Sequence, residues 1–219
     1  MLIAGIDEAG RGPVFGPMVL AVASIEKAHE EKLLEFGVKD SKLLTAKQRE
    51  SQLPEIKKLV NEFLTVKILP QEIDSLRNWK SLNEIEAMRI GALLNGLKEK
   101  PEIVFIDAPD IKAENFAKRI KKYIDFKTIL RSEHKADVNY PIVSAASIIA
   151  KIERDAAIAE LSKSIGEDIG SGYPHDPVTI SFLKEWVHKN NALPDFARKS
   201  WQTSQDCLDK KFQKKLLEC

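Results

Sequence analysis

Two short apolar runs, each closed by a carboxylate, constrain the fold of this 219-residue chain most. Residues 2–6 are apolar and are followed by Asp7 and Glu8, while residues 103–106 form an unbroken apolar run that ends at Asp107. A continuous run of this kind is typical of a strand covered on both faces of a sheet. Ligands of α/β sheets bind outside strand ends, so the sequence predicts an acidic site at one edge of a sheet.

The rest of the chain alternates strands with helices. Patterning predicts strands over 18–25, 62–69 and 126–131, and helices over 28–36, 46–60 (N-capped by Thr45), from Pro70, and over 82–98, 112–123, 141–165, 177–190 and 203–217. A leading hairpin followed by βα crossovers indicates an α/β fold, in which helices flank a mixed five-stranded sheet. We expect a core over 1–165 and a helical extension, packed on that core, over 166–219.

Composition places few limits on function. The 34 basic and 33 acidic residues give a net charge of +1, and an acidic catalytic cluster would cancel a basic nucleic-acid groove in that sum. The two cysteines, Cys207 and Cys219, form neither a disulfide framework nor a metal-ligand pattern, which indicates a reducing compartment. The apolar start breaks at Asp7 and has no basic leader, so we expect a cytoplasmic protein without a membrane span.

A third acidic position, Asp137, precedes the long helix predicted over 141–165. Carboxylates that converge repel one another, and a cation is then expected to hold them together. All-oxygen ligands favour Mg²⁺ or Mn²⁺, and two such ions about 3.5–4 Å apart can activate water and stabilise a leaving oxygen. The structural alternative is that Asp7 and Asp107 cap turns and that Asp137 is the N-cap of the long helix.

Glu8 presents a geometrical difficulty, because adjacent strand residues point to opposite faces. Asp7 and Glu8 can share one site only if the strand ends between them, which the glycine-rich segment that follows permits. Alternatively, Glu8 contributes through its backbone carbonyl.

The segment Gly10-Arg11-Gly12 is a candidate for recognising RNA. Asp7 and Glu8 and the lack of a Lys-Ser/Thr pair exclude a phosphate-binding P-loop. Glycines let backbone approach a ligand closely, and the ribose 2′-hydroxyl is the group that distinguishes RNA from DNA. The alternative is a tight turn that requires small residues.

Other candidates for substrate contacts lie elsewhere in the chain. Tyr173 is an aromatic residue in a loop and could stack on a base or sugar, or simply pack. Lys42 lies in a polar loop that could bind phosphate or be merely solvated. Ser144, Ser147 and Lys151 share one face near the start of the long helix, where a phosphate site or close helix packing is expected.

Several blocks of the chain resemble the ribonuclease HII family, over about residues 2–205. The blocks are Gly5-Ile6-Asp7-Glu8-Ala9-Gly10-Arg11-Gly12 with Gly16-Pro17, Asp40-Ser41-Lys42-Leu43, the strand ending at Asp107, His134-Lys135-Ala136-Asp137 through Tyr140-Pro141, Ser144 to Lys151 with Arg154-Asp155, Gly170 to Pro174, and Ser200-Trp201-Gln202-Thr203. The last two are similar to the archaeal and eukaryotic branch. The resemblance implies a ribonuclease H-like fold with residues 1–165 as the catalytic core.

The resemblance also implies an activity and a set of site residues. Asp7, Glu8, Asp107 and Asp137 would be the catalytic and metal-binding set, with one or two Mg²⁺ or Mn²⁺ ions. Gly10, Arg11, Gly12 and Tyr173 would recognise the ribonucleotide, and Lys42, Ser144, Ser147 and Lys151 would contact the backbone. The enzyme would cleave the RNA strand of RNA–DNA hybrids, and cut 5′ of single ribonucleotides in duplex DNA, leaving 5′-phosphate and 3′-hydroxyl ends.

Partners and competing functions complete the expectations. We expect a monomer, and Gln213 and Leu216 form only half of a sliding-clamp-binding box because the aromatic pair that should follow is missing. One alternative is a catalytically silent hybrid-binding module, against which the intact acidic set argues, since carboxylates weaken binding to a polyanion. Another alternative is a different carboxylate-metal nuclease, such as a 3′ exonuclease or a junction resolvase.

Overall fold

The computed structural model of the chain describes residues 1–38 and 44–217, the side chains of 210–217 excepted. Contacts divide the chain into two compact units. The first comprises Met1–Ala9, Val19–Lys67 and Ser81–Glu153, and the second Gly10–Met18, Ile68–Lys80 and Arg154–Cys219. The division of the chain at residue 165 stays a prediction.

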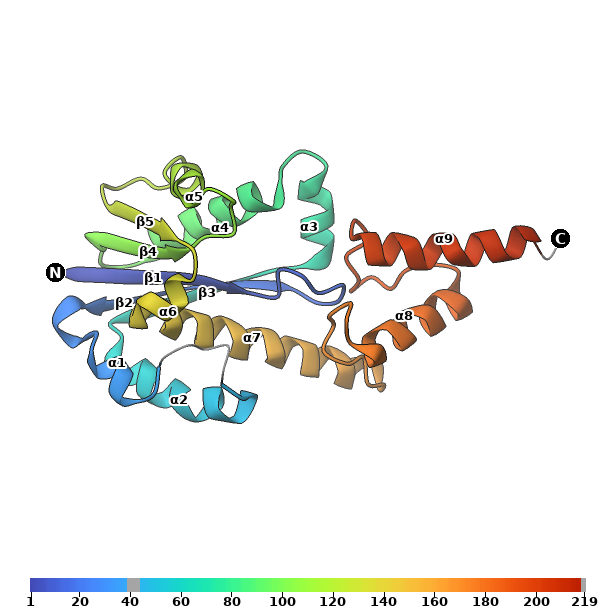
Figure 1. Ribbon diagram of the computed structural model, residues 1–219, viewed down its shortest axis with the longest axis horizontal. Coiled ribbons are helices and arrows are strands. Elements are labelled where there is room, and N and C mark those ends of the chain that lie inside the picture. The colour runs from blue at the N-terminus through green and yellow to red at the C-terminus, as the bar shows by residue number, and fades with distance from the viewer. Residues whose placement is uncertain (39–43, 218–219) are drawn as a thin grey trace. The chain divides into compact units, whose positions relative to one another are not determined.

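Within the described residues, five strands form one sheet in the order β3-β2-β1-β4-β5 (Figure 1). They are β1 (Leu2–Ala9), β2 (Met18–Glu26), β3 (Glu62–Ile68), β4 (Ile103–Asp107) and β5 (Ile129–Glu133). β2 runs antiparallel to β1, whereas β4 runs parallel to β1 and β5 runs parallel to β4. The mixed sheet expected from the sequence is therefore confirmed.

Helices occupy most of the remaining chain. They are the 3₁₀ helix η1 (Lys27–His29), α1 (Lys32–Glu35), α2 (Ala46–Leu59), α3 (Pro70–Arg77), α4 (Leu82–Gly96), α5 (Ala113–Ile120), α6 (Ala136–Asn139), α7 (Pro141–Ile165), α8 (Pro177–Asn190) and α9 (Gln202–Leu217). Thr45 caps α2 as predicted: its hydroxyl accepts from the backbone N–H of Gln48, whose side chain accepts from the backbone N–H of Thr45.

Three elements differ from the prediction. The helix expected over 28–36 is divided into η1 (Lys27–His29) and the four-residue α1 (Lys32–Glu35). The strand expected over 126–131 begins at Ile129, because β5 pairs residue by residue with β4, which itself begins at Ile103. Helix α6 was not predicted, since its four residues are too few to show helical periodicity. Asp137 lies inside α6 and α7 begins at Pro141, so the alternative that Asp137 is the N-cap of the long helix is wrong.

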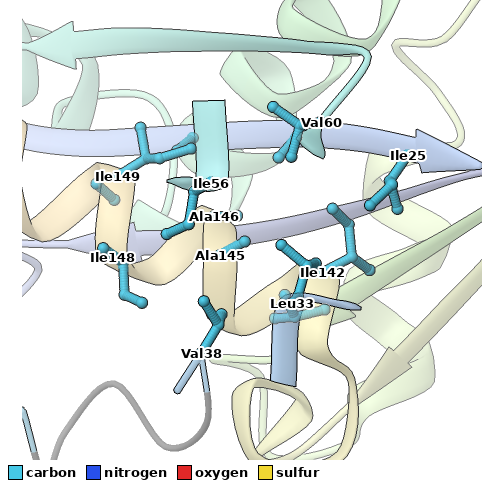
Figure 2. Packing of buried hydrophobic residues seen from close by; sticks show 14 of the residues in the cluster. Ile25, Leu33, Val38, Ile56, Val60, Ile142, Ala145, Ala146, Ile148 and Ile149 are labelled. Carbon is cyan, nitrogen blue, oxygen red and sulfur yellow. The ribbon is translucent and has the colours of Figure 1, made fainter. Parts of the chain in front are cut away.

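The core of the first unit lies between the sheet and the apolar first part of α7. Figure 2 shows Ile142, Ala145 and Ile149 of α7 beside Ile56 of α2 and Ile25 of β2, and all of these side chains are buried. In Figure 1, α4 and α5 lie on the other side of the sheet. Helices therefore cover both faces, which explains the nearly continuous apolar sequence of β1.

The second unit has its own core, and the segment between β1 and β2 is part of it. Phe15 is fully buried, with its ring centroid 5.8 Å from that of Phe182 and 5.4 Å from that of Phe196. The backbone N–H groups of Val14 and Phe15 both donate to the carbonyl of Gly172. These contacts hold residues 10–17 in place as a structured loop rather than a free hairpin connection.

Candidate active site

Asp7 and Asp107 are brought together by the register of two neighbouring parallel strands. Ile6 of β1 is paired with Ile106 of β4. The next residue of each strand is the aspartate, and β4 ends there. Asp7 and Asp107 therefore lie at the same edge of the sheet, as expected for acidic residues that close two neighbouring strands.

Both aspartates also face the same side of the sheet. Residues two apart in a strand share a face. Asp107 shares a face with Phe105, and Asp7 shares one with Ile3 and Ala9, all of which belong to the core beneath α7. The two carboxylates consequently point to the α7 side, where they come near each other rather than diverging.

Asp137 is tied to the same place through its neighbour in the chain. Lys135 adopts the left-handed conformation (φ 58°, ψ 36°), which few residues other than glycine adopt, and so turns the chain into α6. The backbone N–H of Ala136 then donates to Oδ1 of Asp107 over 2.9 Å. Asp137, the next residue, is 1% exposed.

Tyr140 anchors the chain that carries Asp137. Its ring stacks on Phe105 of β4, with centroids 4.1 Å apart and planes inclined by 24°. Its hydroxyl donates to Oε1 of Glu133 at the end of β5 over 2.8 Å, and burial together with this bond raises the pKa of the phenol. The turn from β5 into α7 is thereby fixed at the end of β4.

The environment of Asp7 is one that a cation would stabilise. The side chain is 5% exposed, and burial raises its pKa well above the ordinary value, followed by repulsion from Glu8 and, to a smaller extent, from Asp107. The charge of Lys151 and a hydrogen bond from Ser147 act in the opposite direction. Burial and negative neighbours thus disfavour the ionised carboxylate unless positive charge lies nearby.

Ser147 and Lys151, predicted as backbone contacts, act on Asp7 in the structure. They lie one turn apart on α7, and the Lys151 Nζ donates to the Ser147 hydroxyl, which in turn bonds to Asp7. Ser144 and Ser147 are fully buried, so their side chains offer no accessible surface to a phosphate. Direct contacts from these two serines to substrate stay a prediction that this burial disfavours.

The strand β1 does not end between Asp7 and Glu8, which was the condition for the two side chains to share one site. β1 continues to Ala9, and Glu8 is paired with Leu20 of β2, so the expectation that the strand ends before Glu8 is wrong. Alternation starts the Glu8 side chain on the face opposite Asp7, yet repulsion from Glu8 raises the pKa of Asp7 more than repulsion from Asp107 does, so the Glu8 carboxylate lies near Asp7. A contribution from the Glu8 side chain and one from its backbone carbonyl therefore both stay predictions.

The paired aspartates fit a divalent cation. Among the described residues, no three histidine, cysteine or carboxylate side chains lie in position to hold one ion together. Mg²⁺ does not require such a cage, because it keeps several waters and binds through one or two carboxylates together with substrate phosphates. Asp7 and Asp107 supply that donor set in a buried, negatively charged environment.

The second unit brings together two candidates that are distant in sequence. Gly10 has φ of 81°, a conformation that favours glycine. Gly12 lies against Tyr173, since a Cβ added to Gly12 would be 3.8 Å from Cε1 of that ring. Gly12, which is exposed, and Tyr173 therefore form one surface. Lys42, the remaining candidate, lies outside the described residues.

Two arginines in this unit were not assigned a role from the sequence. The Arg154 guanidinium lies over the Tyr173 ring, 4.9 Å from its centroid, and donates to the carbonyl of Ser171. Its spacing from Ser147 and Lys151 at positions i, i+4 and i+7 was a usable signal. Arg198 bonds to the Gly10–Gly16 loop, and no sequence pattern marks it.

Comparison with known proteins shows the family of the chain. The family model described as ribonuclease HII matches residues 4–204. The chain belongs to the ribonuclease HII family. The ribonuclease HII of Thermococcus onnurineus is 47% identical over 210 residues, which cover 96% of this chain and 91% of that protein.

Two solved structures of the family have the same fold. The ribonuclease H2 of Pyrococcus horikoshii aligns with a TM-score of 0.89 and 41% identity, over 96% of this chain and 98% of that one. The ribonuclease HII in a complex with PCNA from Archaeoglobus fulgidus aligns with a TM-score of 0.83 and 39% identity, over 92% and 96%. The expected ribonuclease H-like fold is confirmed.

Membership of the ribonuclease HII family identifies the reaction. The chain is a divalent-metal-dependent endoribonuclease that binds RNA–DNA hybrids and cleaves their RNA. Among the described residues, no helix is both long enough and apolar enough to cross a bilayer.

Ser147→Ala is expected to lower kcat by about tenfold or more, because a buried hydrogen bond to a charged group contributes about 1.5–3 kcal/mol. Steady-state kinetics on a labelled RNA–DNA hybrid measure this loss. Ser204→Ala is the matched control, since Ser204 is also fully buried on a helix and its hydroxyl oxygen has no hydrogen-bond partner among the described residues. Equal kcat in wild type and Ser147→Ala would show that the hydroxyl does not position Asp7.

Proposed function

We propose that Asp7, Asp107 and Asp137, each supplying part of a coordination shell completed by water and substrate phosphate, hold one or two Mg²⁺ or Mn²⁺ ions, with Glu8 contributing through its main-chain carbonyl. The observation that carries this proposal is the parallel pairing of Ile6 with Ile106, which aligns Asp7 with Asp107. The hydrogen bond from Ala136 to Asp107 adds Asp137 to the group. When bound, such ions activate water and stabilise the leaving oxygen of a phosphodiester.

The remaining residues of the site orient these carboxylates. Ser147 donates to Asp7, and Lys151 supports Ser147 while bringing positive charge near the carboxylate. The Ala136 N–H engages Oδ1 of Asp107 and so sets the direction of the other oxygen. Carboxylates held in this way lose little rotational freedom when an ion and a phosphate arrive, which favours catalysis.

Recognition of the ribonucleotide is assigned to the second unit. Gly10, Arg11 and Gly12 present backbone groups to the 2′-hydroxyl, and Tyr173 stacks on the sugar or base beside it. Their proximity supports this role, since Gly12 faces the Tyr173 ring. The enzyme then cuts 5′ of a ribonucleotide, including a single one embedded in duplex DNA, and leaves 5′-phosphate and 3′-hydroxyl ends.

Partners are proposed on narrower grounds. In addition to RNA–DNA hybrids, the proposed substrates include duplex DNA that contains ribonucleotides. The proposed enzyme acts as a monomer in the cytoplasm. The relative from Archaeoglobus fulgidus forms a complex with PCNA. In this chain Gln213 and Leu216 match half of a clamp-binding box, and Cys219 occupies the first of its two aromatic positions. We therefore do not propose clamp binding through this segment.

An end-labelled DNA duplex with one internal ribonucleotide tests the proposal. A single cut at the 5′ side of that ribonucleotide is expected with Mg²⁺ or Mn²⁺, lost with excess chelator and restored by further ion. The all-DNA duplex of identical sequence is the control and should stay intact. A ladder of products from the 3′ end would indicate an exonuclease, and an uncut single-ribonucleotide duplex beside a cleaved hybrid would contradict the assigned recognition.

A further inference from the structure

Arg198 is the bulkiest fully buried side chain among the described residues, and its surroundings are unusual for a cation. Charged side chains are rarely buried unless their donors are satisfied. Its guanidinium lies over the Trp201 ring, 4.8 Å from the centroid, and its own backbone N–H donates to the carbonyl of Val14 over 2.8 Å. The side chain is thus held against the loop that follows β1.

The guanidinium donates to three backbone carbonyls of that loop. Nη1 reaches the carbonyl of Arg11 over 2.8 Å, Nη2 reaches that of Gly10 over 2.5 Å, and Nε and Nη2 each reach that of Gly16 over 3.2 Å. Two of these carbonyls belong to the segment assigned to ribonucleotide recognition. One side chain therefore holds both ends of the loop.

The loop requires such a restraint. Gly10 and Gly16 both have positive φ, 81° and 78°, and glycine loses more conformational freedom on ordering than other residues. A planar fork of five donors can bind several carbonyls at once, which a lysine ammonium does with less directionality. An arginine at position 198 therefore selects one backbone conformation of residues 10–16.

Holding a carbonyl also sets the direction of the N–H on the same peptide. In a trans peptide the C=O and N–H groups lie in one plane and point in opposite directions. Because the Arg11 carbonyl points toward Arg198, the Gly12 N–H points away from it. Gly12 is exposed and lies beside the Tyr173 ring, so this donor is presented at the proposed recognition surface.

We propose that Arg198 is a positioning residue for ribonucleotide recognition: it fixes the Gly10–Gly16 loop so that the Gly12 N–H faces the ribonucleotide beside Tyr173. The inference rests on the proposed role of that loop and goes beyond it by naming the residue that orders it. Arg198 itself is buried and does not touch substrate.

Selectivity kinetics in Arg198→Lys test the inference. The measured quantity is the ratio of kcat/KM for a single-ribonucleotide duplex to kcat/KM for an RNA–DNA hybrid, since only one 2′-hydroxyl is available in the first substrate. The ratio is expected to fall about tenfold, as for the loss of one well-placed hydrogen bond. Trypsin should also cut the Arg11–Gly12 bond faster, because the loop that Arg198 holds opens more often.

Arg77→Lys is the matched control. The Arg77 guanidinium lies over the same Trp201 ring, 5.3 Å from the centroid, so this change alters a neighbouring stacked arginine without changing Arg198. Its selectivity ratio is expected to stay within about twofold of wild type, as is usual for surface substitutions. An unchanged ratio in Arg198→Lys, or an equal fall in Arg77→Lys, would overturn the inference.

Tyr173→Ala separates failure of this inference from failure of the proposed function. If Tyr173→Ala lowers the ratio and Arg198→Lys does not, the recognition surface stands and the role of Arg198 is wrong. If neither variant lowers the ratio, the recognition surface itself is wrong and the inference fails with it.

Amide hydrogen exchange in the wild-type protein provides a test that needs no variant, should Arg198→Lys fail to fold. With chelator present to prevent cleavage, the Gly12 amide is expected to exchange more slowly when a single-ribonucleotide duplex is bound than when the all-DNA duplex is bound. Equal exchange with the two duplexes would overturn the inference.

Discussion

Asp7→Asn is expected to lower kcat on an RNA–DNA hybrid by about a thousandfold or more while leaving the melting temperature equal to wild type or higher. The carboxylate is proposed to hold the catalytic ion, whose stabilisation of the transition state is worth several kcal/mol. The amide is isosteric, and its Oδ1 can still accept the bond that the Glu8 N–H donates to Asp7 over 2.8 Å. Activity is therefore lost without loss of the local fold.

The direction in which Asp7→Asn changes stability follows from the pKa of Asp7. Burial, then Glu8 and Asp107, raise the pKa of Asp7, so the native state binds a proton more tightly than the unfolded chain does. The stabilisation that protonated Asp7 contributes to the native state is fully present below the pKa of this group in the unfolded chain. It is lost as the pH rises through the raised pKa of Asp7 in the native state. At neutral pH without added ion, the variant avoids this loss, and its advantage in melting temperature should shrink as the pH is lowered.

Glu55→Gln is the control for charge alone. Glu55 lies on α2, where its carboxylate pairs with Lys58 across one helical turn, and it has no part in the proposed site. Its activity should match wild type. Near-normal turnover of Asp7→Asn, measured with saturating Mg²⁺, would show that the metal site is wrongly assigned, and a large fall in its melting temperature would show that Asp7 is chiefly structural.

Gly5→Ala is expected to lower the free energy of unfolding by about 3 kcal/mol, the upper end of the range for overpacking a core, because the added methyl group meets rigid atoms. A Cβ at this position would lie 2.4 Å from the carbonyl carbon of Ile142 and 2.5 Å from the backbone nitrogen of Val143. These are backbone atoms of α7, so no side chain can rotate away. For a chain of this size the melting temperature should fall by about 6–12 °C.

The same substitution should also reduce activity in the protein that remains folded. Ser147, which bonds to Asp7, lies on α7 five residues after Ile142, and a helix pushed from β1 carries its hydroxyl away. Gly96→Ala is the matched control, since its Cβ would meet only the flexible end of Leu64 at 3.3 Å. Calorimetry that finds equal stability for Gly5→Ala and wild type would contradict the close approach of β1 and α7.

Sequence patterns located the catalytic candidates but not all of their neighbours. Asp7 and Asp107 were recognisable because each closes an apolar run, a feature of local sequence. The face to which Glu8 points was not, since it depends on β1 continuing to Ala9 against β2. Helix α6 was missed for a related reason: four residues carry no periodicity, and Asp107 holds its first N–H from another part of the chain.

The contacts of Ser147 and Arg198 show most clearly what could not be predicted from the sequence. Ser147 was recognised as belonging to one face of the long helix, but its hydrogen bond to a carboxylate of β1 could not be predicted from that face. Arg198 acts on a loop 188 residues earlier in the chain, at Gly10. No window of neighbouring residues contains both partners of such a contact.

The sequence by itself indicated the candidate site residues, most of the strands and helices, and the family to which the chain belongs, because these depend on residue types and spacings within short stretches. Only the tertiary structure decided the register of β1 against β4, the pairing of Glu8 with Leu20 of β2, the hydrogen bond between Ser147 and Asp7, and the hydrogen bonds of Arg198 to the Gly10–Gly16 loop. Those features depend on how distant segments pack, and the free energy of packing belongs to the assembled chain rather than to any one segment.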